Sequence, residues 1–492
     1  MSSLRFFVPS WLHFTLMTSV QLVVVGGGPG GYAAAFLAAD LGLSVALVDP
    51  EANPGGVCVY RGCIPSKALL HVARVIAESR HAAAWGVEFG EPKVDLAKLR
   101  DFKNTVVKRL TGGTGQLVKA RRIQYVQGLA EIVDGHRLLV KASAGGTGSA
   151  GNDVEMQFDH AILATGSTPS IPAALAVEDQ RVMDSTAALD LPDIPQSLLV
   201  VGGGYIGLEL GTVYATLGSA VTVVEMTPGL LPGADRDLVD VLAKRVAQTM
   251  KSVLLETRVV QMAGDGRGIL VKMEGKAGAK EELFDRVLVA VGRRPNSGVP
   301  GLDRTRVRLD DRGFIIVDEQ RRTGEPSIFA IGDVVGEPML AHKASHEGRV
   351  AVEVIAGANV AFAPRAIPAV VFTDPELAWA GLTESQAAKE NRTVTVAKFP
   401  WGASGRAITL DRTDGLTKLI LDPQTERLLG VGLVGPGAGE LIAEGVLAIE
   451  MGANATDLRL SIHPHPTLTE TVMESAEVFF GQATHVYRPR RG

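Results

Sequence analysis

An apolar run that ends in a glycine turn is the first strong pattern in the chain. Residues 22–25 are all apolar and predict a buried strand, and residues 26–31 read Gly-Gly-Gly-Pro-Gly-Gly. An alanine-rich stretch then predicts a helix, and residues 44–48 predict a second strand that ends at Asp49. This order of strand, glycine turn, helix, strand and acid is typical of a unit that binds a dinucleotide.

The same pattern returns in the middle of the chain. Residues 198–201 predict a strand, residues 202–207 read Gly-Gly-Gly-Tyr-Ile-Gly, and a helix pattern leads to a strand over 220–224 and to Glu225. In both copies the acid lies 23 positions after the first glycine of the turn. One glycine turn is weak evidence, because such turns also serve simple packing, but two complete units predict two dinucleotides bound by one chain.

Each part of this pattern has a physical purpose. The first glycine makes the tight turn, the second lets a pyrophosphate approach the backbone, and the third lets helix and strand pack closely. The helix N-terminus then holds the phosphates. Asp49 and Glu225 would accept hydrogen bonds from ribose hydroxyls and repel a 2′-phosphate, which argues against NADP at either site. The candidate glycines are Gly26, Gly28 and Gly31 in the first unit and Gly202, Gly204 and Gly207 in the second.

Further apolar runs predict the rest of the two sheets and a different C-terminal part. Residues 161–166 and 286–292 predict strands that return to the two sheets, and the small residues at their ends, Thr165, Gly166 and Gly292, are further candidates for cofactor binding. Residues 141–153 are rich in Gly, Ser and Ala and predict a loop. Residues 417–421 and 427–433 predict an antiparallel hairpin, and a helix is expected over about 438–451.

Composition and charge exclude several classes of protein. A length of 492 residues indicates about three to four domains. Apolar residues at 46% and charged residues at 21% are ordinary for a folded chain. The net charge of −5 comes from mixed charges without a basic stripe, so we expect no nucleic-acid partner. The long uncharged stretch 22–39 contains the glycine turn, so we expect no membrane span.

The first residues have no element of their own. Residues 1–16 contain one Arg and no acid, without an apolar run followed by a small-residue cleavage site. We interpret residues 1–17 as a disordered extension that arises from a mis-assigned start. The expected compartment is the reducing cytoplasm.

The only two cysteines lie five positions apart. Cys58 and Cys63 stand in a Gly-Gly-Val-Cys-Val-Tyr-Arg-Gly-Cys-Ile-Pro-Ser-Lys segment that leads into a predicted helix. Pro65 lies near the first turn of this helix, and residues 68–79 carry its periodicity. A helix N-terminus together with Lys67 and Arg61 would lower the pKa of a thiol and hold a reactive thiolate. The alternatives are two buried small hydrophobic residues or a two-ligand metal site, which lacks partners nearby; we predict no metal.

A second candidate for chemistry lies near the C-terminus. Residues 462–470 read Ile-His-Pro-His-Pro-Thr-Leu-Thr-Glu. Thiol–disulfide exchange needs a base near neutral pH, which suits His465, and a carboxylate such as Glu470 would orient its imidazole. Taken alone, the two histidines are equally compatible with a metal pair or with buried core histidines.

Together these segments carry a resemblance over residues 18–478. The cysteine segment, residues 323–333 (Thr-Gly-Glu-Pro-Ser-Ile-Phe-Ala-Ile-Gly-Asp), residues 340–348 and 399–407, and the His-x-His-Pro-Thr-x-x-Glu run resemble the motifs of the pyridine-nucleotide disulfide oxidoreductases. The similarity is greatest to the branch of the family that oxidises protein-bound dihydrolipoamide to lipoamide and reduces NAD⁺ to NADH.

The resemblance implies cofactors and a role for each site residue. The first unit would bind FAD and the second NAD, and Asp333 would hydrogen-bond the ribityl chain of the flavin. Lys67 would lie beside the flavin and pair with Glu209. Cys58 and Cys63 would form the redox-active disulfide, with Cys58 meeting the substrate and Cys63 facing the flavin. His465 would be the base and Glu470 its orienting partner, both contributed by the other subunit of a homodimer.

The resemblance also implies a fold and partners. The expected class is α/β, with two Rossmann-like dinucleotide-binding domains and a C-terminal α+β interface domain. The partners would be the lipoyl domain and acyltransferase core of a 2-oxo acid dehydrogenase complex, or a glycine-cleavage carrier protein. The expected boundaries are 18–165 for the FAD domain, 166–295 for the NAD domain, 296–365 for a central domain that completes the FAD site, and 366–492 for the interface domain.

Two alternative functions stay open. A glutathione-type reductase shares the disulfide and flavin motifs, but basic residues would be expected where Glu225 stands, because such enzymes favour NADP. A largely structural component of a 2-oxo acid dehydrogenase complex would be favoured by loss of the cysteines or of His465, and all are present. The chain departs from the family at Val59-Tyr60-Arg61, where Tyr60 replaces a residue near the cysteines and Arg61 adds a charge.

Overall fold

The structure is a computed structural model that describes residues 16–142, 153–276 and 278–487. The chain divides into two compact units. The first comprises Met1–Tyr60, Lys108–Thr168 and Arg294–Phe362, and the second comprises Arg61–Val107, Pro169–Arg293 and Ala363–Gly492.

The first unit is built on a six-stranded sheet in the order β1-β2-β3-β4-β5-β16. Strand β1 pairs in parallel with β2 and with β5, and β5 pairs in parallel with β16. The residues of β2 are all buried, because both faces of the sheet are covered there. Val45 and Leu47 belong to one hydrophobic cluster, and Ala46 and Val48 belong to another. The strands are β1 (Leu16–Val25), β2 (Val45–Asp49), β3 (Gln124–Asp134), β4 (Arg137–Ala142), β5 (Val154–Leu163) and β16 (Ile328–Ala330).

Strand β1 begins earlier than the sequence suggested. Leu16 and Met17, which we predicted in a disordered extension, pair with Val154 and Glu155 of β5. The reason is that β5 extends beyond β2 and offers backbone hydrogen-bonding groups to the start of β1. Residues 1–15 of the predicted extension lie outside the described residues.

The predicted loop over 141–153 falls between two antiparallel strands. Strands β4 and β5 pair from Arg137↔Gln157 to Val140↔Val154, so β4 leads into this segment and β5 leads out of it. Residues 143–152 lie outside the described part of the chain.

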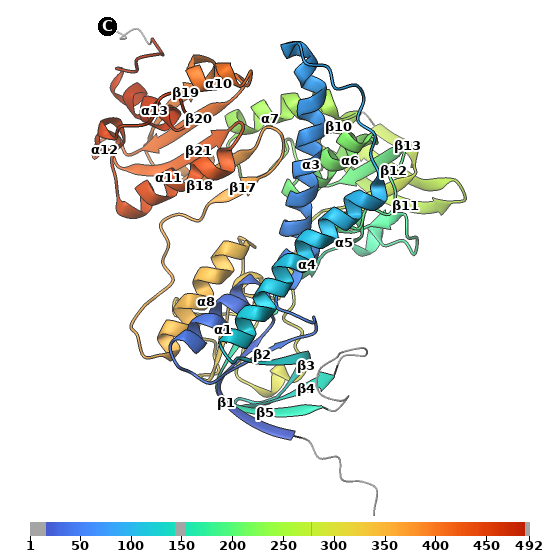
Figure 1. Cartoon of the computed structure of the whole chain (residues 1–492), viewed down its shortest axis with the longest axis vertical. Coiled ribbons are helices and arrows are strands. Elements are labelled where there is room, and N and C mark those ends of the chain that lie inside the picture. The colour runs from blue at the N-terminus through green and yellow to red at the C-terminus, as the bar shows by residue number, and fades with distance from the viewer. Residues whose placement is uncertain (1–15, 143–152, 277, 488–492) are drawn as a thin grey trace, which may run out of the picture. The chain divides into compact units, whose positions relative to one another are not determined.

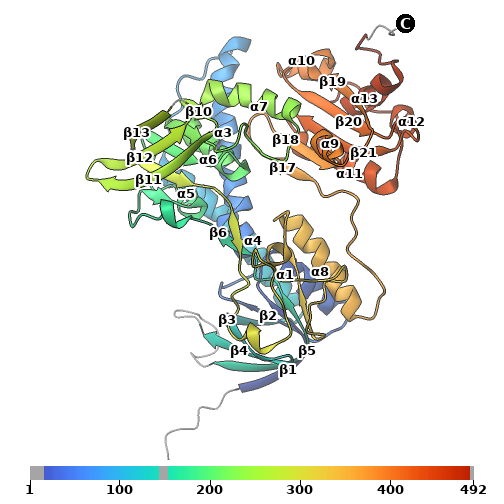
Figure 2. The ribbon, with the colours of Figure 1, turned by 180° about the vertical axis from the view of Figure 1, so that it is seen from behind.

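Helices α1 (Pro29–Asp40) and α8 (Ala341–Ile355) lie side by side in the first unit, although 312 positions separate their starts in the sequence (Figures 1 and 2). Small residues let them approach closely. A Cβ at Gly348 would lie 2.8 Å from the carbonyl oxygen of Gly30, and a Cβ at Gly30 would lie 3.0 Å from the Cβ of Ala344. Helix α8 also contacts the short turn Gly332–Val335, so this packing brings α1 and the end of the 323–333 motif to the same helix.

The second unit contains a parallel sheet in the order β10-β9-β8-β14-β7, with α6 connecting β8 to β9. The strands predicted over 198–201 and 220–224 are observed as β8 (Ser197–Val201) and β9 (Ala220–Val224). Helix α3 (Cys63–His81) packs against α6 (Tyr205–Leu217) within this unit. An antiparallel sheet, β11-β12-β13, follows in the sequence.

The C-terminal part of the second unit is a five-stranded antiparallel sheet in the order β17-β18-β21-β20-β19. The predicted hairpin is confirmed as β20 (Leu416–Leu421) and β21 (Leu428–Val434). The predicted helix is confirmed as α11 (Ala438–Met451), which packs on β18 and β21, while α13 (Glu470–Phe480) packs on β19 and β20 (Figure 2).

Within the described residues, no helix combines the length and the apolar character that a membrane span requires.

The remaining helices and strands complete the two units. The other helices are α2 (Gly56–Arg61), α4 (Leu96–Ala120), α5 (Ser185–Leu189), α7 (Arg236–Thr249), α9 (Glu384–Lys389), α10 (Gly405–Thr409) and α12 (Ala455–Leu460). The other strands are β6 (Ser167–Pro169), β7 (Val182–Met183), β10 (Ser252–Leu254), β11 (Thr257–Asp265), β12 (Gly268–Gly275), β13 (Gly278–Phe284), β14 (Arg286–Val289), β15 (Arg293–Pro295), β17 (Ala369–Val371), β18 (Leu377–Gly381) and β19 (Thr395–Pro400).

Candidate active site

The first glycine turn joins β1 to α1 in a form that only glycine allows. Gly26 has φ +107°, and a Cβ there would collide with the carbonyl oxygen of Ala164. A Cβ at Gly31 would collide with the carbonyl oxygen of Gly26, so the third glycine is needed for helix and strand to pack. The space in front of Gly28 is open by comparison, since the nearest atom to a Cβ there is the Cα of Gly56 at 3.9 Å.

The surroundings of this turn fit a dinucleotide. The N-terminus of α1 has no side-chain cap and no acid in its first turn, so its N–H groups are available to a phosphate. Asp49 is buried at the end of β2, and its carboxylate accepts hydrogen bonds from the backbone N–H groups of Gly27 and Glu51. The carboxylate is thereby oriented beside the turn, where a ribose hydroxyl would reach it.

The second glycine turn, in the second unit, repeats this geometry. Gly202 has φ +110° and lies against the carbonyl oxygen of Ala290, and Gly207 lies against Gly202. A Cβ at Gly204 would meet nothing within 4 Å, which leaves room for a pyrophosphate. The N-terminus of α6 also lacks a side-chain cap and an acid.

Glu225 occupies the position that Asp49 has in the first unit. Its Oε2 accepts a hydrogen bond from the N–H of Gly203 at 2.7 Å, and its Oε1 accepts one from the N–H of Thr227 at 2.8 Å. Both turns therefore offer helix N–H donors, room for a pyrophosphate at the second glycine and a buried acid for a ribose, and both fit a dinucleotide. Gly292 follows β14 with φ +138°, and its carbonyl accepts a hydrogen bond from Ser170 at 3.0 Å.

Thr165, Gly166 and Asp333 lie in the first unit on segments that follow adjacent strands. The hydroxyl of Thr165 donates to the carbonyl oxygen of Asn296 at 2.8 Å, and Gly166 has φ +71°. The carboxylate of Asp333 accepts a hydrogen bond from the hydroxyl of Ser167 at 2.5 Å. Asp333 follows β16 directly, in the short helical turn Gly332–Val335.

Sequence reasoning did not assign Glu347, which supports this last turn. Its carboxylate is fully buried and accepts a hydrogen bond from the N–H of Gly332 at 2.6 Å. Lys343 and Arg321 each lie 3.1 Å from the same carboxylate and supply its counter-charges. Glu347 lies in the 340–348 motif, so its place in that motif was the signal that could have marked it.

The two cysteines lie on consecutive helices. Cys58 is half-buried within α2, and Cys63 is exposed as the first residue of α3. The first turn of α3 contains no acid, so the N-terminal end of that helix favours a thiolate. Helix α3 begins at Cys63, which places Pro65 in its first turn as the sequence predicted.

Tyr60, where the chain departs from the family, is held in place within the first unit. Its hydroxyl donates to the carbonyl oxygen of Asn53 at 3.0 Å, and its ring lies against Gly55. Burial raises the pKa of Tyr60, so the hydroxyl keeps its proton and acts as a donor. The side chain thus ties α2 to the segment that precedes it.

Lys67 and Glu209 are brought together within the second unit, although 142 positions separate them. The Nζ of Lys67 lies 2.8 Å from Oε2 of Glu209, which is buried, and 4.5 Å from the centre of the Phe372 ring. The second oxygen of Glu209 accepts the N–H of Phe372 at 2.9 Å. Phe372 was not anticipated, and no motif in the sequence marks it.

His465 and Glu470 form a dyad at the start of α13. The Nδ1 of His465 lies 2.9 Å from Oε1 of Glu470, whose other oxygen accepts the N–H of Thr467 at 2.8 Å. Burial acts to raise the pKa of Glu470, but the hydrogen bonds from Thr467 and His465 outweigh it and hold that pKa below its usual value. The carboxylate is therefore charged at neutral pH and orients an imidazole that is 73% exposed.

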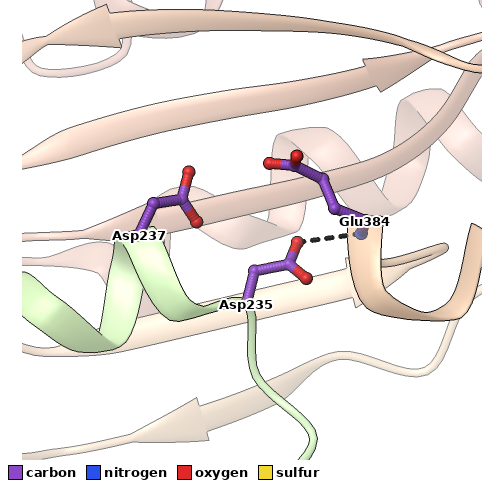
Figure 3. A group of neighbouring side chains, drawn as sticks. All are labelled: Asp235, Asp237 and Glu384. Atoms are coloured by element: carbon purple, nitrogen blue, oxygen red, sulfur yellow. Dashed lines mark hydrogen bonds between the residues drawn. The ribbon is translucent and has the colours of Figure 1, made fainter. Parts of the chain in front are cut away.

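A group of three carboxylates in the second unit has the spacing of a metal site, with one oxygen of each of Asp235, Asp237 and Glu384 within 4.8 Å of the others (Figure 3). Two lysines already form ion pairs with this group. The Nζ of Lys418, which is 1% exposed, lies 2.7–2.8 Å from all three carboxylates, and Lys398 contacts Asp237 and Glu384. We therefore interpret the group as an ionic network that joins α7, α9, β19 and β20.

Comparison with known families identifies the class of protein. Residues 20–348 match the pyridine nucleotide-disulphide oxidoreductase family, and residues 367–476 match the dimerisation domain of the same family. The chain belongs to the pyridine nucleotide-disulphide oxidoreductases. Members of this family use FAD and NAD, which the two glycine turns fit. The α/β class with Rossmann-like domains and a C-terminal dimerisation domain is thereby confirmed.

Individual relatives narrow the comparison. A dihydrolipoyl dehydrogenase of Haemophilus influenzae is 50% identical over 464 residues, which cover 94% of this chain and 96% of the relative. A dihydrolipoyl dehydrogenase of Thermus scotoductus is 44% identical over 96% of this chain and 99% of the relative. Among solved structures, LpdA of Mycobacterium tuberculosis aligns with a TM-score of 0.85 at 28% identity, covering 94% of this chain and 99% of that one.

Proposed function

We propose that the protein oxidises protein-bound dihydrolipoamide to lipoamide and reduces NAD⁺ to NADH. Relatives that are 50% identical over nearly the whole chain are dihydrolipoyl dehydrogenases. The observation that carries the proposal is the His465–Glu470 dyad, because a dithiol substrate must lose protons before it can be oxidised.

The dyad determines which atom accepts the proton. A carboxylate only accepts hydrogen bonds, so Nδ1 of His465 carries a hydrogen and donates a hydrogen bond to Glu470. The other nitrogen, Nε2, is then the basic atom, and the exposure of the ring lets a substrate reach it. Glu470 stabilises the imidazolium that forms when Nε2 takes a thiol proton.

The proposed reaction begins with the Cys58–Cys63 disulfide. One substrate thiol gives its proton to His465, and its sulfur attacks Sγ of Cys58, so that a mixed disulfide forms and Cys63 leaves as a thiolate. The sulfur of the second substrate thiol attacks the first and its proton passes to the sulfur of Cys58, which closes the lipoamide disulfide and releases Cys58 as a thiol. Bound FAD would take the electron pair from the dithiol and supply it to NAD⁺ as a hydride. The helix end at Cys63 stabilises the thiolate that this step requires.

Cofactor assignment follows from the two turns. We assign FAD to the turn that contains Gly26, Gly28 and Gly31, and NAD to the turn that contains Gly202, Gly204 and Gly207. In this assignment Asp333 binds the ribityl chain and the Lys67–Glu209 pair lies beside the flavin. Glu225 supports NAD over NADP, because its buried carboxylate would face a 2′-phosphate.

We also propose a homodimer with shared active sites, in which His465 and Glu470 serve the cysteines of the partner subunit. The dimerisation domain supports this arrangement, and several large apolar side chains lie exposed near its C-terminal end. Leu447 and Met451 on α11, with Leu460 and Ile462 beyond it, are 63–98% exposed in the single chain. Burying them against a second copy would remove that surface from water.

The proposed partners are the lipoyl domain and acyltransferase core of a 2-oxo acid dehydrogenase complex, or a glycine-cleavage carrier protein. The support is the name of the relatives together with a base that is open to a large thiol substrate. We propose the cytoplasm as the compartment, where these thiols are kept reduced.

The test is turnover of a lipoylated protein domain with NAD⁺ by the purified FAD-loaded dimer. We expect reduction of NAD⁺ that requires the lipoyl group, and little activity when reduced glutathione replaces the lipoyl domain. Cys58→Ser is the matched control, since it should retain FAD and lose turnover. Activity with glutathione and NADP⁺ but not with the lipoyl domain would overturn the proposal in favour of a glutathione-type reductase.

A further inference from the structure

The two histidines of the segment 461–469 have opposite surroundings. This segment connects α12 to α13 and contains both (Figure 1). The side chain of His465 is 73% exposed, whereas that of His463 is only 7% exposed. The function proposed above uses His465 and leaves the buried ring of His463 without a purpose.

Both ring nitrogens of His463 face oxygen acceptors. Nδ1 lies 2.9 Å from the carbonyl oxygen of Ser461, and Nε2 lies 2.7 Å from Oε1 of Glu444. A carbonyl oxygen can only accept, so Nδ1 carries a proton. A second proton must lie between Nε2 and Glu444, on one atom or the other, so the pair is held by a short hydrogen bond and carries no net charge in either form.

Glu444 lies on a helix that is held firmly in place. It lies on α11, whose neighbouring residues Ile442, Gly445 and Ala448 are buried against the sheet. A Cβ at Gly445 would lie against the side chain of Val431, so the helix is packed closely on β21 at this turn. A side chain on such a helix is a better anchor than one on a loop.

A fixed position of His463 also restricts the position of His465, because the chain between them is short and stiff. Only Pro464 separates them, so their Cα atoms lie at most about 7 Å apart. Pro464 and Pro466 have fixed φ angles, which removes freedom on both sides of His465. On the other side, Glu470 holds the segment through the N–H of Thr467.

We propose that Glu444 and His463 are positioning residues for the base His465. They hold one side of the segment while Glu470 holds the other, so that Nε2 of His465 meets the substrate thiol in a fixed place. This inference rests on the proposed function, since it assigns the pair to the thiol half of that reaction. It predicts that loss of the pair slows lipoamide turnover and leaves electron transfer that uses no thiol substrate unchanged.

The experiment compares two activities of the FAD-loaded dimer. Glu444→Ala should lower kcat with dihydrolipoamide and NAD⁺ by roughly 10- to 100-fold, the range seen when a reacting group is displaced or loses its supporting partner. NADH-dependent reduction of an artificial dye should stay at the wild-type rate. Glu444→Gln should keep most of the lipoamide activity, because an amide still hydrogen-bonds to Nε2. Glu440→Ala, an exposed acid one turn earlier on α11, is the matched control.

A double-mutant cycle separates positioning from a general structural role. If Glu444 acts through His465, Glu444→Ala should cause no further loss in a His465→Ala background. Equal losses in both backgrounds, or a parallel fall in dye reduction, would overturn the proposal. If the alanine variant does not fold, His463→Phe keeps a ring, removes both ring nitrogens and so breaks the same contact from the other side; it is judged by the same criteria. A wild-type enzyme without lipoamide turnover would instead contradict the proposed function.

Discussion

Removal of the buried Lys418 ammonium is the most quantitative stability test that the structure offers. The substitution Lys418→Met keeps an unbranched side chain and removes only the charge and its hydrogen bonds. Its Nζ lies 2.7 Å from Asp235, 2.8 Å from Asp237 and 2.8 Å from Glu384, and the side chain is 1% exposed. After the substitution, three carboxylates would face one another with Lys398 alone beside two of them.

The expected loss in the free energy of unfolding depends on the positive charges and hydrogen bonds that each carboxylate retains. Breaking a buried ion pair by removing one partner costs about 3–5 kcal/mol. Asp237 and Glu384 keep contacts with Lys398 and are partly open to solvent, so their share is reduced. Asp235 is 5% exposed and retains only its hydrogen bonds with the N–H groups of Glu384 and Ser385 and with the Ser385 hydroxyl. We therefore expect about 3 kcal/mol, which corresponds to a fall of roughly 3–5 °C in the melting temperature of a protein of this size.

The loss of stability caused by Lys418→Met should become smaller as the pH falls. Burial acts to raise the pKa of Asp235 and of Asp237, but hydrogen bonds and charge from the lysines outweigh burial and lower both. Depressed pKa values mean that the stability contributed by these groups is present above the ordinary carboxyl pKa, near 4, and is lost as the pH falls through the depressed values. The variant's carboxylates take up protons more readily, so the gap between the two proteins should narrow in acid.

The assay is thermal unfolding of the FAD-loaded dimer at neutral pH and in acid, at fixed protein and FAD concentrations. Lys389→Met, an exposed lysine on α9, is the matched control. The double variant Lys418→Met, Asp235→Asn should recover part of the loss, because it removes the uncompensated charge. A Lys418→Met protein whose melting temperature at neutral pH equals that of the control variant would refute the reasoning.

Three further predictions concern the reaction. Replacing Glu225 by Gln should narrow the preference for NADH over NADPH, measured as the ratio of kcat/KM; an unchanged ratio, or a wild type that favours NADPH, would count against the role of Glu225. Cys58→Ser and Cys63→Ser should each abolish lipoamide turnover and retain FAD; in the wild type, two-electron reduction should give a long-wavelength band between flavin and thiolate, and its absence would argue against Cys63 as the flavin-facing thiol. His465→Ala should lose about 10²–10⁴-fold of lipoamide activity, and refolding it together with Cys58→Ser should restore part of it; no recovery in proven mixed dimers would reject a shared site.

Local patterns let the sequence determine much of this protein. The glycine turns with their acids, the cysteine segment and the His-x-His-Pro-Thr-x-x-Glu run are each contiguous, so spacing alone marked Asp49, Glu225 and the two cysteines as candidates. The hairpin β20–β21 and helix α11 were predicted for the same reason, because apolar periodicity and turn residues act over a few positions. The pairing of Lys67 with Glu209 was expected only from the family resemblance.

Only the tertiary structure decided which distant charges meet. Lys418 reads as an ordinary strand residue, and its burial among Asp235, Asp237 and Glu384 depends on how α7, α9 and β20 pack. The same holds for Glu347 beneath Gly332. The sequence places His463 beside His465 but cannot tell that one ring is buried on Glu444 and the other exposed. Such contacts are made by side chains on separate elements, and their free energy depends on distance and burial, which no local pattern contains.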